Sequence, residues 1–153
     1  MPYDFGRWYL SFITALPQII GGFFLTFYFS PRNMGVPWKS EYSDLKTFEV
    51  SPIFIEVVQE FGFIFTMHPR FFAASAAYSV FFGGICLITG CFTRLASLFI
   101  FLTMLVTLLF REFDQSWSYI PTFTFLSISM LGLRFGSGRV GMDYAISKWL
   151  NWA

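Results

Sequence analysis

Few residues of this chain have the type and spacing that catalysis or metal binding requires. The single histidine, His68, stands alone, and the two cysteines, Cys86 and Cys91, lie within one apolar run. A self-contained zinc or copper site needs a larger set of ligands at defined spacings, and a bis-histidine haem needs two histidines. The sequence therefore predicts no metal site and no haem held by this chain alone.

Two carboxylates and one glycine-rich string are the remaining candidates for chemistry. Glu56 and Glu60 are spaced to share one helix face, where paired carboxylates can hold a proton or a cation, although a solvated face is the commoner arrangement. The string Gly136–Gly141 reads GSGRVG and matches the dinucleotide fingerprint G-x-G-x-x-G. That fingerprint needs a preceding strand, whereas an apolar run precedes it here, so a flexible turn is the better interpretation.

Arg139 and Asp143 follow one another closely in the same part of the chain. They are placed to pair and hold the turn together. Alternatively, Arg139 binds a lipid phosphate or a quinone carbonyl. We favour the structural or lipid role, because arginines beside membrane spans commonly serve it.

The composition indicates the surroundings of the elements that must position these residues. Of the 153 residues, 56% are hydrophobic, 12% are charged and 23 are phenylalanine. Soluble domains carry about 25% charged residues, so this chain lacks the charge to cover a surface facing water. A net charge of +1 argues against nucleic-acid binding, which requires a basic stripe.

The apolar runs predict an all-α fold, a transmembrane four-helix bundle forming a single membrane domain over residues 1–153. The expected spans are about 8–30, 71–90, 95–110 and 117–133, and none contains an Asp or Glu. Because ion-coupled transporters usually carry such residues in their spans, transport by this chain alone is not expected. Pro17 is expected to kink the first span.

Two short amphipathic helices are expected on the membrane surface. The first lies in the outer loop 31–70, where Phe54, Val57, Val58 and Phe61 repeat at helical spacing. The second covers 142–152. Trp117 stands at a predicted interface, first as an anchor and second as a stacking platform for a quinone ring.

Small residues predict where helices pack closely. Gly21 and Gly22 allow another backbone to approach the first span. In the second span, small residues lie on the expected packing face: Ser75, Ser79, Gly83 and Gly84.

Four spans place both termini on one side of the membrane. Lysines and arginines are equally divided between the two sides, but Lys39 and Lys46 lie far from the span ends, where they count less. We therefore expect both termini in the cytoplasm.

Three stretches carry a family resemblance. The central stretch, FGGICLITGCFTRLASLFIFLTML, supplies Gly83, Gly84, Gly90, Thr93, Arg94, Leu95 and Ala96; the tail supplies Gly136, Gly138, Arg139 and Asp143; the start supplies Gly6 and Arg7. The chain resembles the DoxX-like membrane proteins, which have four spans. Relatives often carry a glutamate just before the Gly-Gly pair, where this chain has Val80, Phe81 and Phe82.

The resemblance implies a bacterial inner-membrane protein near quinone chemistry, since family members include small subunits of a terminal quinol oxidase and of thiosulfate:quinone oxidoreductase. Arg94, Arg139, Asp143 and Trp117 are then the candidates to meet a lipid or quinone headgroup. Two hypotheses follow. The chain is an accessory subunit of a larger respiratory or redox complex, without its own catalysis or cofactor, that binds other membrane subunits and lipid. Alternatively, it is a redox component that binds a quinone.

Overall fold

The computed structural model describes residues 8–38, 45–110, 119–136, 141–142 and 148. The first rod joins α1 (Trp8–Phe24), a π-helical segment η1 (Leu25–Phe29) and α2 (Ser30–Asn33). Two short helices follow, α3 (Pro52–Gln59) and α4 (Phe63–Met67). Three long helices complete the chain: α5 (Pro69–Thr89), α6 (Thr93–Phe110) and α7 (Tyr119–Phe135). The all-α membrane-type fold is confirmed.

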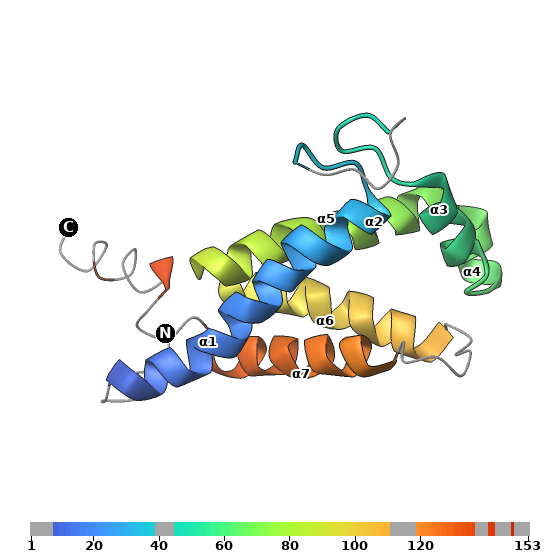
Figure 1. The fold of residues 1–153 in the computed structure, drawn as a ribbon. Coiled ribbons are helices and arrows are strands. Elements are labelled where there is room, and N and C mark those ends of the chain that lie inside the picture. The colour runs from blue at the N-terminus through green and yellow to red at the C-terminus, as the bar shows by residue number, and fades with distance from the viewer. Residues whose placement is uncertain (1–7, 39–44, 111–118, 137–140, 143–147, 149–153) are drawn as a thin grey trace.

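The long helices form a bundle in which each packs against its neighbours in the chain (Figure 1). α5 contacts α1 and α6, α6 contacts α7, and α7 contacts α1, which closes the ring. The core is built from buried apolar side chains of all four rods: Leu25, Val80, Leu87, Ile100, Met104 and Phe125.

Three helical stretches are long and apolar enough to cross a bilayer: Phe12–Asn33, Pro69–Thr89 and Thr93–Phe110. Ile120–Phe135 is apolar but shorter. The 17 residues of α7 extend about 26 Å, against a hydrocarbon thickness of about 30 Å. The predicted fourth span begins at residue 117, outside the described residues, so this crossing stays a prediction.

The first rod departs from α-helical hydrogen bonding at η1. Pro17 lies inside α1, and the kink expected there stays a prediction. In η1 the hydrogen bond closes over five residues instead of four. The backbone N–H of Ser30 donates to Leu25 O, and the Ser30 hydroxyl donates to the same oxygen at 2.8 Å. A buried serine therefore holds the π-turn closed.

Part of the outer loop folds back as a lid, which we define as residues 34–38 and 45–51. Met34 and Val50 form an antiparallel bridge, and the Gly35 N–H donates to Glu49 O at 2.8 Å. Met34 and Val36 are buried against Phe81 and its neighbours on α5. The lid is thus packed onto the bundle through its own apolar residues.

The predicted amphipathic helix is present as α3, but its apolar face contacts protein. Val58 is buried, and Phe54, Ile55 and Phe61 pack with Phe65 of α4 and Ala73 of α5. The apolar face of α3, which we expected to lie on the membrane surface, is therefore covered by α4 and α5. Of the second predicted helix, 142–152, only Met142 and Lys148 are among the described residues.

Glycines set the closest helix contacts. A Cβ at Gly22 would lie 2.6 Å from Gly84 O, so α1 and α5 approach backbone to backbone, as expected at Gly22. A Cβ at Gly83 would lie 2.8 Å from the Ile100 side chain of α6. Gly83 and Gly84 therefore serve two different contacts of α5.

Ser75 and Ser79 lie differently from the two glycines. Ser75 is exposed, and its hydroxyl donates to Phe72 O of its own helix; the half-buried Ser79 donates to Ser75 O. Besides the two glycines, the buried small residues on this helix are Ala73 and Ala77. A contact of the serines with a further protein stays a prediction.

Candidate functional site

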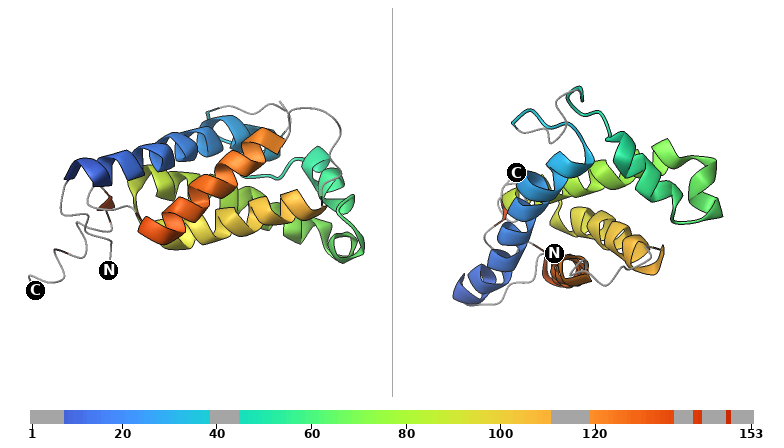
Figure 2. Two further views of the ribbon diagram at one scale, coloured as in Figure 1. Left: turned by 90° about the horizontal axis from the view of Figure 1, so that it is seen from below. Right: turned by 45° about the vertical axis from the view of Figure 1, so that its right-hand side comes forward.

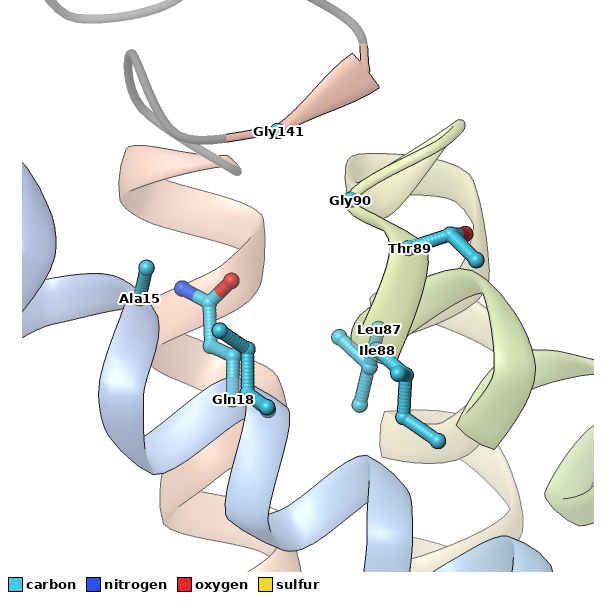
Figure 3. Close-up of a pocket in the computed structure, with 8 residues that line it drawn as sticks. Ala15, Gln18, Leu87, Ile88, Thr89, Gly90 and Gly141 are labelled. Carbon is cyan, nitrogen blue, oxygen red and sulfur yellow. The ribbon is translucent and has the colours of Figure 1, made fainter.

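A cavity of ≈ 60 Å³ opens between the first rod and the end of α5 (Figure 3). Its walls are mainly apolar and come from three segments: Ala15, Gln18 and Ile19 of α1; Leu87, Ile88, Thr89 and Gly90 at the end of α5; and Gly141. The volume equals that of about two water molecules in the liquid. It is therefore large enough for a polar end group rather than a whole cofactor.

Gln18 is the polar group buried in this wall, with only 1% of its surface exposed. Its Nε2 donates a hydrogen bond to Gly136 O at 3.1 Å. The amide oxygen points toward the Thr89 and Gly90 side of the cavity (Figure 3). This arrangement offers one hydrogen-bond acceptor to a small donor group in an otherwise apolar space.

The end of α5 is shaped by a left-handed turn. Gly90 has φ +67°, and its N–H donates to Cys86 O. Only glycine adopts such a conformation at no cost. The turn leads directly to Thr93 and the start of α6, and Thr93 is fully buried.

Arg94 is brought beside the end of α7 by this turn. Its Nε lies 3.5 Å from the position that a Cβ on Gly136 would take. The Arg94 side chain itself is exposed. Arg94 and Gly136, which are far apart in the sequence, therefore meet at one end of the bundle.

The other predicted headgroup residues, Arg139, Asp143 and Trp117, lie outside the described residues. Their roles remain predictions. Among the described residues, no three His, Cys, Asp or Glu side chains gather where they would hold a metal ion. Cys86 and Cys91 are half-buried thiols.

Sequence reasoning missed Gln18. Its signal was present, because Gln18 is the only amide or charged side chain between Trp8 and Ser30, and a strongly polar residue in a span is often functional. The sequence could not show its partner, Gly136, which lies just after α7.

The DoxX family model matches residues 45–112. Over these residues, the chain is DoxX-like. The matched segment covers the second part of the lid, α3, α4, α5 and α6, and it includes Gly83, Gly84 and Arg94. The match supports the expected DoxX-like resemblance over this segment, and together with the apolar helices it indicates a multi-pass membrane protein.

No curated protein and no solved structure matches the chain. The candidate site lies partly outside the DoxX segment. Leu87 to Gly90 and Arg94 belong to the segment, whereas Gln18 and Gly136 come from α1 and the end of α7. The cavity is thus formed where the DoxX helices meet the rest of the bundle.

Proposed function

We propose that this chain is an accessory subunit of a larger membrane complex and that a partner subunit binds its lid. The observation that carries the proposal is a fixed but exposed aromatic surface. Trp38 is 47% exposed and Phe48 is 41% exposed, although both rings contact Phe81 of α5. Exposed aromatic residues of this kind are typical centres of protein–protein interfaces.

The lid is held in place by specific contacts. The Trp38 ring stacks on Phe81 with a centroid distance of 5.7 Å and lies 5.2 Å from Phe27. The Tyr78 hydroxyl donates to Phe48 O at 3.0 Å. Because the surface is ordered before a partner binds, little of the binding free energy is spent on ordering it.

The respiratory or redox setting of the complex is supported by the family resemblance. The location in a bacterial inner membrane rests on the same resemblance, and cytoplasmic termini rest on the distribution of lysine and arginine. In this orientation the lid faces the outside of the membrane. Its partner is then an outward-facing domain or loop of another membrane subunit.

The test is purification of the tagged full chain from its natural membrane in mild detergent. We expect a stoichiometric partner that is lost from the Trp38→Ala and Phe48→Ala variants. A matched control is Met130→Ala, because Met130 is also an exposed apolar residue but lies on α7. A chain that purifies alone, carries stoichiometric quinone and reduces it with a thiol or sulfur donor would overturn the proposal.

The second candidate function is a quinone-binding redox component, and the Gln18 cavity is the observation that favours it. A quinol hydroxyl group is a suitable donor to the Gln18 oxygen, with Arg94 at the same end of the bundle. We expect this function to show as bound quinone that is lost from a Gln18→Leu variant and kept in Gln59→Leu. Absence of quinone from the purified wild-type complex would exclude it.

A further inference from the structure

A cluster of large apolar side chains on and beside α4 is strongly exposed. We define the α4 patch as Phe63, Ile64, Met67 and Phe71, whose exposed fractions run from 62% to 82%. Phe63, at 82%, is the most exposed large apolar residue in the described part of the chain. Phe63 and Met67 lie four residues apart and so share one face of α4, and Phe71 follows in the first turn of α5, which begins two residues after α4 ends.

The patch is attached firmly to the membrane helices through Phe65. This ring is buried on the opposite side of α4 and lies 5.0 Å from Phe72 of α5 and 5.2 Å from Phe110 of α6. Gly62, with φ +122°, interrupts the helical backbone between α3 and α4 and sets the direction of α4. The position of α4 is therefore fixed by ring contacts with two spans.

The α4 patch continues the apolar outer surface of α6. Leu109 and Phe110, at the end of that helix, are both exposed. The 18 residues of α6 extend about 27 Å, which is close to the hydrocarbon thickness. The contact between Phe65 and Phe110 thus places α4 at the membrane boundary of one leaflet. Figure 2 shows α3 and α4 to one side of the bundle, away from α1 and α7.

The polar residues around the patch are arranged as an interface requires. The exposed polar groups Glu56, Gln59 and Glu60 lie on α3 or at its end, before the turn at Gly62. His68 and Arg70, both exposed, lie between Met67 and Phe71. A cation at this place suits the phosphate level of a bilayer, and an apolar helix face suits the layer just below it.

We propose that the α4 patch inserts into the lipid leaflet beside the bundle and acts as an interfacial anchor. Its ligand is the bilayer itself, at the boundary between headgroups and acyl chains. The anchor is separate from the lid, so it holds whether or not the accessory-subunit proposal is correct. It also differs from the expected role of α3, whose apolar face is covered by protein.

The experiment measures the depth of single labels in the full chain. Cys86 and Cys91 are replaced by alanine, and single cysteines are introduced by Phe63→Cys and Met67→Cys. Each cysteine carries an environment-sensitive fluorophore, and the protein is reconstituted into phosphatidylcholine–phosphatidylglycerol vesicles. Quenching is measured with aqueous iodide and with lipids that carry a nitroxide at a shallow or a deep position.

Two matched positions set the scale: Gln59→Cys on α3 for water, and Leu102→Cys on the exposed side of α6 for the membrane interior. We expect the Phe63 and Met67 labels to be quenched several-fold more by shallow nitroxide lipids than the Gln59 label, and several-fold less by iodide. Labels at both positions that behave like the Gln59 label would overturn the proposal. Labels protected from both quenchers would overturn it too, because they would show that protein covers the patch.

Discussion

The Gln18 carboxamide on the first membrane helix donates a hydrogen bond to the carbonyl oxygen of Gly136, 118 positions later in the chain, at 3.1 Å. Gly136 is the residue just after α7; it has φ +66°, and its N–H donates to Gly132 O. The carbonyl groups at the end of a helix lack partners within the helix. Gln18 donates to one such carbonyl group from another helix and so joins α1 to α7.

We therefore expect Gln18→Leu to lower the free energy of unfolding by about 1–3 kcal/mol, because a buried carbonyl loses its donor. The measurement is unfolding in mixed detergent micelles, followed by circular dichroism. Gln59→Leu is the control, since Gln59 is exposed on α3. Equal stability of the two variants would show that the bond does not stabilise the bundle.

The Gly22–Gly84 contact predicts a second effect. A Cβ on Gly84 would overlap Thr26 Oγ1 and would lie 3.0 Å from Gly22 O. We expect Gly84→Ala to destabilise the protein by about 1–3 kcal/mol, the usual cost of overpacking. Ser75→Ala, at an exposed position of the same helix, should change the stability little.

The double variant Gly84→Ala with Thr26→Ala tests whether the overlap with Thr26 is the cause. Thr26 Oγ1 is buried and makes no hydrogen bond within the described part of the chain. Removing it should recover part of the loss, so the two changes are expected to be non-additive. Strict additivity would point to the Gly22 backbone instead.

Replacing two buried serines is expected to change the stability differently. Ser51 precedes α3 at the N-cap position, but its hydroxyl makes no hydrogen bond to a described residue, whereas the Ser30 hydroxyl donates to Leu25 O. An N-cap serine normally contributes about 1 kcal/mol. We expect Ser51→Ala to be nearly neutral and Ser30→Ala to cost about 1 kcal/mol, both measured as unfolding free energies in micelles. The reverse order would contradict the hydrogen bonding described for the two residues.

Orientation is tested by labelling from the two sides of the membrane. In the background without Cys86 and Cys91, we expect Thr47→Cys, on the lid, to react with an impermeant maleimide in intact cells. Met142→Cys should react only after lysis, because both termini are expected inside. Both residues are exposed. Labelling in the opposite order would reverse the topology.

The spans could be predicted from the sequence because lipid imposes long runs without charge. The predicted spans 71–90 and 95–110 nearly coincide with α5 and α6. Gly22 was also expected to allow a close approach. These features depend only on local composition and on the bilayer thickness.

The remaining features depend on contacts between distant residues. The stacking of Trp38 on Phe81 and the bond from Gln18 to Gly136 join segments whose proximity no local pattern reveals. The apolar face of α3 was recognised, but the same periodicity fits a bilayer or a protein neighbour. Arg94 came from the resemblance, and its position beside Gly136 required the fold.

The π-helical segment has a consequence for how the first rod is read along the chain. A π-turn accommodates one residue more than an α-helix does, and one residue corresponds to a rotation of about 100°. Gln18, before the segment, bonds to Gly136 at the end of α7. Met34, the first residue of the lid, follows the segment and packs on α5. The extra residue therefore sets the rotation of the two parts of the rod relative to each other. If one residue were deleted from Leu25–Phe29, either the Gln18 contact or the Met34 contact would be rotated away from its partner. A related chain that lacks this residue would need a different lid or a different closure of the bundle.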